Sequence, residues 1–378
     1  MMPGTNTENV ETKLDQICAE IIGPAAPEVD RTGSFPTESI AALKNAGLMG
    51  AMSAREVGGL GLGLRTTAGI IRRVSRECGS TAMVLCMHYC GTAVLEAYGS
   101  QDVRRAAAAG DHLSTLAFSE AGSRSHFWAP VSTARRNANG VLLDAKKSWV
   151  TSASKATAYV WSSQPLEAPG FSTIWLVPAS AAGLTVHGPF DGLGLRGNDS
   201  SPVSAAGVHV PESAMLGPDG KGFDVMMGIV LPVFNVLNAA CSVGLMEAAV
   251  ERTTRHAANT RYSHITSSLA DLPTIRNYLA RMQIKTDMAR GLLEETLAAI
   301  EAGRGDTLLR VLECKAAAGE TANEVLDMAM RICGGFAFRK DIGVERYFRD
   351  ARAAGVMAPT TDVLYDFIGK AVCGMQLF

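Results

Sequence analysis

The chain has 378 residues, of which 47% are hydrophobic, and its formal net charge at pH 7 is −2. This length and composition are sufficient for a large core shared by two or three packed regions. The nearly balanced charge provides no basic field that would attract nucleic acid, so we expect no nucleic-acid partner. The polar, acidic N-terminus differs from a signal peptide. We also expect no membrane partner, because Pro232 and Asn235 interrupt the apolar stretch at residues 225–236.

The eight cysteines contain no C-x-x-C pair. Cys86 and Cys90 lie four positions apart in an apolar stretch, which is more typical of buried thiols on one helix face than of a metal site. We therefore expect no bound metal. Without an ordered cysteine framework, the natural setting is a reducing cytoplasm.

The first 113 residues have the pattern of helices, with apolar side chains recurring at intervals of three and four. A helix is predicted over residues 40–46, with Gly47 as its stop signal. Residues 56–63 form a glycine-rich turn that lacks the spacing of a P-loop or a dinucleotide-binding fingerprint. This region is predicted to be an N-terminal helical domain.

Residues 114–222 have a different sequence pattern, in which short apolar segments alternate with Gly, Ser, Pro and Asp. Strands are predicted over residues 141–145, 158–162 and 173–178. Helical patterning returns over residues 223–378, with long segments at 236–256, 274–301 and 308–332. Segments of this length are typical of a helical bundle. The fold class is therefore α+β and mostly α, in the order helical, β, helical.

Several short motifs follow one another in a familiar order. They are the glycine turn at residues 56–61, the loop Ala117-Phe118-Ser119-Glu120-Ala121-Gly122-Ser123-Arg124-Ser125, then Trp149-Val150-Thr151-Ser152, Cys333-Gly334-Gly335 and Arg349-Asp350-Ala351. In this order and spacing the chain resembles the acyl-CoA dehydrogenase superfamily over nearly its whole length. The resemblance implies an FAD-dependent oxidoreductase. Its fold would have an N-terminal helical domain (1–113), a central β-barrel-like domain (114–222) and a C-terminal helical bundle (223–378).

The resemblance also implies which residues bind FAD. Trp149 would offer its ring to the isoalloxazine, and Thr151 would place a hydroxyl near flavin N5. Ordinary packing within the β domain is the alternative role for Trp149. The backbone N–H groups of the loop would bind the pyrophosphate, as an anion nest does. The remaining flavin contacts of the same subunit would be Leu116, Phe118, Ser119, Ser125 and Thr360.

In this family a second subunit completes the cofactor site. By resemblance its contribution falls on Arg261, Arg331, Gly334 and Gly335, although the surrounding residues match the family pattern imperfectly. A surface arginine is the alternative role for Arg261. If the match holds, the protein is a homo-dimer or homo-tetramer.

The catalytic carboxylate of the family is absent from its usual place. The family base is a Glu that follows the Arg-Asp-Ala run, and here that position falls on Ala358, with Pro359 next to it. Some members carry the base on another helix, where this chain has Phe234 and, at the substrate-side Arg, Asn235. An apolar side chain cannot accept a proton. Loss of a general base typically slows a reaction by about 10²–10⁴-fold.

Three residues are candidates for the missing base. Asp362 follows Ala358 by one helical turn and is expected on the same helix face, with a polar flavin contact as its alternative role. His126 ends the flavin loop, where the family usually has Asp, and a loop-surface histidine is its alternative. His88 lies in an apolar helix, which favours a core histidine with satisfied hydrogen bonds.

The leading functional prediction is an oxidoreductase acting on a small acyl group, carried as a thioester of CoA or of an acyl carrier protein. The electron acceptor would be an electron-transfer flavoprotein or O₂. One alternative is a flavin monooxygenase on the same fold, which needs no dehydrogenase Glu. The other is a subunit without a base that completes the FAD site of an active partner.

Overall fold

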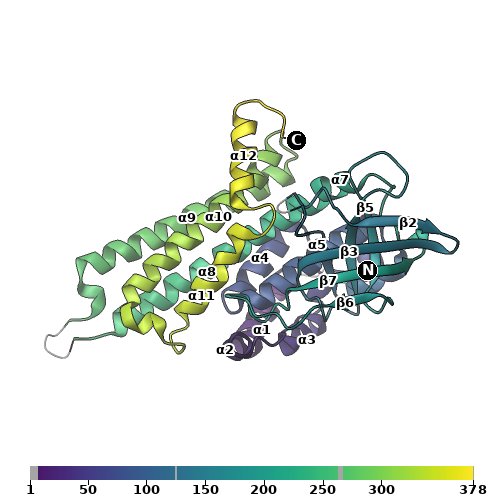
Figure 1. Ribbon diagram of the computed structural model, residues 1–378. Coiled ribbons are helices and arrows are strands. Elements are labelled where there is room, and N and C mark those ends of the chain that lie inside the picture. The colour runs from purple at the N-terminus through teal and green to yellow at the C-terminus, as the bar shows by residue number, and fades with distance from the viewer. Residues whose placement is uncertain (1–6, 124–125, 263–266, 378) are drawn as a thin grey trace.

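A computed structural model describes residues 7–123, 126–262 and 267–377 (Figure 1). Its N-terminal part is helical, as predicted. The helix expected at residues 40–46 is α3, and Gly47 follows it with φ 75°, a left-handed conformation that ends helices. Cys86 and Cys90 are buried on one helix, as expected for structural thiols. The helices are α1 (Thr7–Ile17), α2 (Gly23–Thr32), α3 (Thr37–Asn45), α4 (Leu64–Ser75), α5 (Gly79–Tyr98) and α6 (Gln101–Ala109).

The middle part forms two sheets, with the strand orders β1-β4-β5 and β2-β3-β7-β6. Strand β1 pairs in parallel with β4, whereas the other neighbours are antiparallel. The three predicted strands are confirmed and correspond to β3, β4 and β5. The strands are β1 (Ser114–Ala117), β2 (Thr133–Asn137), β3 (Gly140–Val150), β4 (Ala158–Ser163), β5 (Thr173–Pro178), β6 (Leu184–Val186) and β7 (Ser201–Val210).

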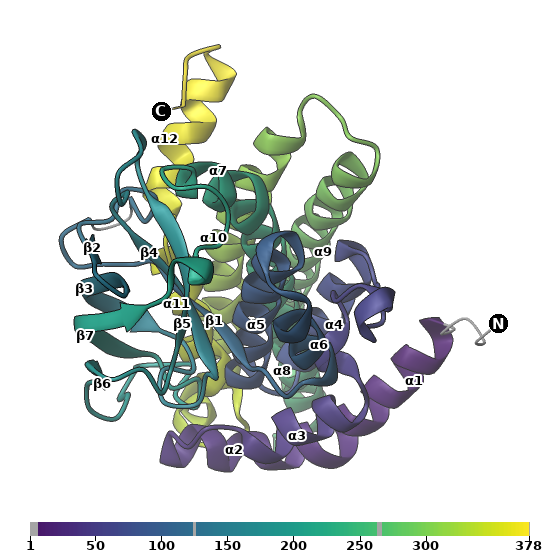
Figure 2. The same cartoon turned by 90° about the vertical axis from the view of Figure 1, so that its right-hand side faces the viewer.

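The C-terminal part returns to helices, and the three long predicted segments are confirmed as α8, α9 and α10. The helices are α7 (Gly222–Val225), α8 (Leu231–Asn259), α9 (Pro273–Glu301), α10 (Thr307–Cys333), α11 (Val344–Val356) and α12 (Thr361–Val372). Figures 1 and 2 show α8 to α11 as a bundle that extends away from the sheets, with α12 projecting beside them.

Pro232 and Asn235 interrupt the apolar run of the sequence but not the helix, because helical structure runs without a break over Gly222–Asn259. Pro232 is the second residue of α8, which directly follows the π-helical turn Met226–Val230, so the helix continues across it. Asn235 donates from Nδ2 to the Val311 carbonyl of α10 at 3.2 Å. This helix is long and apolar enough to cross a membrane, but 83% of its most apolar window is buried inside the fold.

Two clusters of buried side chains hold the molecule together. The larger cluster spans the N-terminal helices and the bundle, and the smaller one contains side chains of both sheets. Helix α5 joins them, because it packs on α4 and α8 and also on β1. The flavin motifs predicted at the ends of β1 and β3 therefore lie where the sheets meet the helices.

Candidate active site

The end of strand β3 presents Trp149 to solvent. Its side chain is 70% exposed, and its φ of 54° is rare for a residue with a bulky side chain. The exposure excludes ordinary packing as the role of this ring. Left-handed backbone at such a residue persists only where its surroundings enforce it, and it occurs preferentially at functional sites. Trp149 is therefore available to stack on a planar cofactor ring, which fits a flavin.

Thr151, two residues further on, is held from both sides. Its hydroxyl lies 3.1 Å from the Ser200 hydroxyl, and its carbonyl accepts a hydrogen bond from the Thr115 hydroxyl at 2.7 Å. The residue is only 4% exposed. The structure thus fixes Thr151 firmly beside the exposed Trp149.

The predicted flavin loop is attached to the same strand. The Ser148 N–H donates to the Ser119 carbonyl at 2.9 Å. Leu116 and Phe118 are buried, so their side chains belong to the core and only their backbone could reach a cofactor. Ser125 lies outside the described residues.

A buried ion pair joins this loop to β3, and sequence reasoning missed it. Lys147 Nζ lies 2.5 Å from a carboxylate oxygen of Glu120, and both side chains are excluded from solvent. Lys147 also donates to the carbonyl and hydroxyl of Ser162, while Glu120 accepts from the N–H groups of Val131 and Ser132. Burial lowers the pKa of Lys147 to about 8, against the opposing effect of Glu120. The pair fixes the loop relative to Trp149.

Ala358 and Asp362 do not lie on one helix. Helix α11 ends at Val356, Ala358 lies in the following loop, and Asp362 lies in the first turn of α12. The expected shared helix face is therefore wrong. The residue before a proline is disfavoured in the helical conformation, so Pro359 separates the two helices. Thr360 is the N-cap residue of α12 and is half-buried.

Asp362 and His126, two of the three candidate bases, line the same pocket of about 490 Å³. The His126 ring packs edge-on against Trp128, with centroids 5.1 Å apart. Neither Trp149 nor Ala358 lines this pocket. Its other lining residues are mostly apolar: Trp128, Phe171, Phe223, Val363, Asp366, Phe367, Lys370 and Leu377. A carboxylate and an imidazole at the edge of an apolar pocket could hold an acyl group and accept a proton from it.

His88 has the core role that the sequence favoured. It is fully buried, its Nε2 lies 3.0 Å from the Met49 carbonyl, and its Nδ1 accepts from the Ser114 N–H at 3.1 Å. Burial lowers its pKa to about 4. His88 is thus a neutral structural link between helices and β1.

Lys315 of α10 lies between Ala358 and Phe234, the two positions at which the family resemblance would put the base. Its ammonium donates to the carbonyls of Ala354, Met357 and Pro359 at 3.0, 3.1 and 2.8 Å. These carbonyls lie on both sides of Ala358 in the chain. On the other side it lies 6.0 Å from the centre of the Phe234 ring. Burial lowers the pKa of Lys315 to about 7. All three N–H donors are used by carbonyls, so this amine holds the loop and is not free to act as a base.

The residues predicted for the second subunit's part of the cofactor site lie elsewhere. Arg261 follows α8, and Arg331, Gly334 and Gly335 lie where α10 ends. Figure 1 shows these helix ends at the extremity of the bundle away from the sheets. The His256 ring of α8 packs on Phe336, with centroids 5.5 Å apart, which brings the two ends together. Within one chain this group does not meet Trp149.

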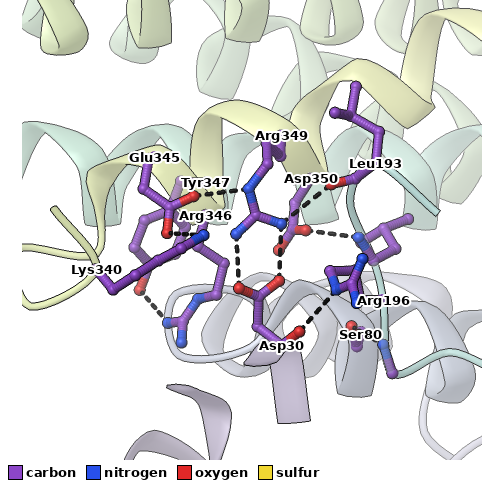
Figure 3. Close-up of polar contacts among 12 residues, drawn as sticks. Asp30, Ser80, Leu193, Arg196, Lys340, Glu345, Arg346, Tyr347, Arg349 and Asp350 are labelled. Atoms are coloured by element: carbon purple, nitrogen blue, oxygen red, sulfur yellow. Dashed lines mark hydrogen bonds and ion pairs between the residues drawn. The ribbon is translucent and has the colours of Figure 1, made fainter. Parts of the chain in front are cut away.

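The Arg-Asp-Ala run on α11 connects separate parts of the fold (Figure 3). Arg349 makes a two-pronged ion pair with Asp30 of α2, at 2.8 and 2.6 Å, and a second ion pair with Glu345 at 2.6 Å. Asp350 is buried and accepts from the Leu195 N–H at 2.6 Å. The run therefore has a structural role that its sequence position alone did not reveal.

Comparison with known proteins agrees with this geometry. Three profiles match in order: acyl-CoA dehydrogenase, N-terminal domain over residues 5–109, middle domain over 115–208 and C-terminal domain over 220–373. The human mitochondrial short-chain specific acyl-CoA dehydrogenase is 27% identical over 372 residues, covering 96% of this chain and 88% of the relative.

Two solved structures share the fold. Butyryl-CoA dehydrogenase from Megasphaera elsdenii superimposes with a TM-score of 0.90 at 20% identity, covering 97% of this chain and 98% of that one. The prolyl acyl carrier protein oxidase AnaB superimposes with a TM-score of 0.89 at 18% identity, covering 97% and 99%. At such identities the likeness shows the fold alone.

Proposed function

Because the chain belongs to the acyl-CoA dehydrogenase family, we propose that it oxidises an acyl thioester without the usual glutamate base of that family. Membership makes it an enzyme, a flavoprotein oxidoreductase whose cofactor is FAD. Beyond membership, we propose a carrier for the acyl group, a base and an electron acceptor.

The observation that carries the proposal is the placing of Asp362 and His126 around one apolar pocket of about 490 Å³. This volume is within the range of small-molecule sites, about 300–1,000 Å³. The aromatic lining suits an acyl chain. Asp362 lies in the first turn of α12. We assign the base to Asp362 and an orienting role to His126.

The reaction would divide the substrate's two hydrogens between protein and cofactor. Bound FAD supplies the acceptor for a hydride from the β-carbon. The α-proton goes to the Asp362 carboxylate, and the electron pair of that C–H bond forms the new C=C bond. An electron-transfer flavoprotein or O₂ would then take the two electrons. Trp149 would pack on the flavin ring, and Thr151 would offer its hydroxyl to N5.

The absence of the usual Glu is supported by the surroundings of Ala358 and Phe234. Both side chains are apolar, and the buried amine of Lys315 lies 6.0 Å from the centre of the Phe234 ring and donates to the carbonyl of Pro359, the neighbour of Ala358. Neither of the usual base positions offers a proton acceptor, so we place the base on another element, α12, whose Asp362 lines the pocket.

The carrier is proposed to be CoA or an acyl carrier protein. The relatives' names mention CoA thioesters, and AnaB is named as an oxidase of a prolyl acyl carrier protein. Lys370, at the opposite end of α12 from Asp362, lines the same pocket, and its ammonium forms an ion pair with Asp366 at 3.0 Å. We propose that this ammonium also binds a phosphate of the carrier. Both carriers have such a phosphate, at the end of the pantetheine arm that is remote from the thioester.

We also propose a homo-dimer or homo-tetramer. Arg261, Arg331, Gly334 and Gly335 lie at the end of the bundle away from the sheets, so only a second copy could bring them to the flavin of the first. Sedimentation should give an FAD-loaded oligomer. A stable monomer that retains FAD would contradict this proposal.

The test is anaerobic reduction of the FAD-loaded protein by acyl groups of increasing length, each supplied on CoA and on an acyl carrier protein. We expect loss of the flavin's visible absorbance and an enoyl thioester as product, detected by mass spectrometry. A protein that binds no FAD, or FAD that no thioester on either carrier reduces, would contradict the proposal.

The apolar side chains at both usual base positions also favour a second candidate, a flavin monooxygenase. Such chemistry needs reduced flavin and O₂ and a pocket that keeps water out. Dithionite-reduced protein would then consume O₂ quickly in the presence of substrate. Purification as a mixed oligomer with a related active chain would instead favour the subunit without a base.

A further inference from the structure

One loop, residues 193–200, connects helix α11 with the end of strand β3. Helix α11 contacts the first half of this loop closely (Figure 3). Asp350 accepts from the Leu195 N–H at 2.6 Å, and Arg349 donates to the Leu193 carbonyl at 3.0 Å. A Cβ on Gly194 would lie 2.4 Å from the Arg349 carbonyl oxygen, so the loop could not lie this close with any larger residue.

Two more helices hold the middle of the loop. Arg196 donates to the Asp30 carbonyl of α2 at 2.8 Å, and the Gly197 N–H donates to the Ser80 hydroxyl of α5 at 3.1 Å. Three helices that are far apart in the chain thus fix this short segment. The loop is therefore a rigid part of the fold.

The second half of the loop holds the residues that follow Trp149. The N–H groups of Ser152 and Ala153 donate to the carbonyls of Asn198 and Asp199 at 2.9 and 3.0 Å. The Asp199 carboxylate accepts from the N–H and the hydroxyl of Ser154, each at 2.7 Å. As described above, the Ser200 hydroxyl lies 3.1 Å from that of Thr151.

Both ends of this connection contain strained backbone. Leu195 and Asp199 have φ values of 50° and 53° in the loop, and Trp149 and Ser152 have 54° and 57° at the end of β3. A residue other than glycine persists in this left-handed conformation only where its surroundings enforce it. On the 193–200 loop, the first contact that holds this conformation is the hydrogen bond from the Leu195 N–H to Asp350.

We propose that Asp350 is a positioning residue, which acts through the 193–200 loop to hold Thr151 and the backbone after Trp149 in the geometry that faces the flavin. The inference rests on the flavin site of the proposed function. Asp350 itself touches neither substrate nor cofactor in this assignment.

The first test is hydrogen–deuterium exchange of the FAD-loaded protein, read on peptides that contain residues 152–154. Asp350→Ala removes the acceptor of the Leu195 N–H and should speed exchange there by about tenfold or more. Asp350→Asn keeps an oxygen acceptor and should show much of the native protection. Glu345→Gln is the matched control, because it lies on the same helix and bonds Arg349 without touching the loop. Native protection at 152–154 in Asp350→Ala, or equal loss in the control, would overturn the proposal.

The second test is the midpoint potential of the bound flavin in Asp350→Ala, Ser200→Ala and the double variant. Two changes on one line of contacts should shift the potential in the same direction and combine to less than their sum. Fully additive shifts, or no shift in either single variant, would overturn the proposal. If Asp350→Ala does not fold, Asp350→Asn takes its place in the cycle. If the folded proteins bind no FAD, the proposed function fails, while the exchange experiment on the apoprotein still decides whether the loop connects Asp350 to β3.

Discussion

The ammonium group of Lys147 lies 2.5 Å from the carboxylate of Glu120, and neither side chain is exposed to solvent. The pair joins the two stretches of chain that the family resemblance assigns to the flavin. Removing one partner of a buried ion pair leaves an uncompensated charge, which is strongly destabilising. The geometry of the flavin loop therefore depends on this contact.

Lys147→Met should weaken FAD binding, because the loop would lose its fixed position beside Trp149. We expect the dissociation constant for FAD to rise by about tenfold or more, measured by quenching of FAD fluorescence in a titration of apoprotein. Lys146→Met is the control, since Lys146 is the exposed neighbour on the same strand. Native affinity in Lys147→Met would show that the pair does not shape the cofactor site.

Asp350 should make the protein's stability depend on pH in a defined window. Burial raises the pKa of Asp350 to about 6 from 3.8, while the Leu195 N–H and the Arg346 guanidinium lower it and Asp30 raises it further. The folded state thus binds the proton more tightly than the unfolded chain. The stabilising contribution is complete below about pH 4 and is lost as pH rises through 6.

Asp350→Asn removes this titration. The stability difference between variant and native protein should therefore shift in favour of the variant by roughly 2 kcal/mol between pH 4 and pH 7. Urea unfolding at a series of pH values measures it. The other charged or titratable groups near Asp350 are Arg349 on its own helix, Cys78 before α5 and Cys241 on α8. A difference that does not vary over this range would show that Asp350 titrates as in the unfolded chain.

Much of the fold could be predicted from the sequence, because it follows from local patterns. The three long bundle helices have apolar side chains at helical spacing, and β5 was placed at its observed bounds from its run of β-branched and aromatic residues. Strands β1, β2, β6 and β7 lie outside the strand segments that the sequence predicts.

The site could be predicted only in part. Trp149 and Thr151 lie within one short motif, and the family resemblance of that motif assigns both of them to the flavin. Lys315 and Asp350 act through backbone groups of segments distant in sequence, and no spacing rule predicts such contacts. Asp362 was singled out, but for a wrong geometric reason, because the loop around Pro359 separates it from Ala358.

Ala358→Glu should increase oxidation of simple acyl-CoA thioesters. The new carboxylate would lie in the loop that Lys315 holds, and a nearby ammonium favours the ionised form that can accept a proton. We expect flavin reduction to be faster by about tenfold or more. Val356→Glu is the control, because it adds the same charge at an exposed position at the end of α11. No gain over native and control would show that residue 358 does not face the substrate.

The most direct test of Asp362 as the base is the rate at which bound FAD loses its visible absorbance after anaerobic mixing with an acyl thioester. The comparison is between native protein, Asp362→Asn and Asp366→Asn, since both aspartates lie on α12 and line the same pocket. If Asp362 is the base, the rate should be at least about 100-fold lower in Asp362→Asn and close to native in Asp366→Asn. Reduction at the native rate in Asp362→Asn would contradict the assignment of Asp362 as the base.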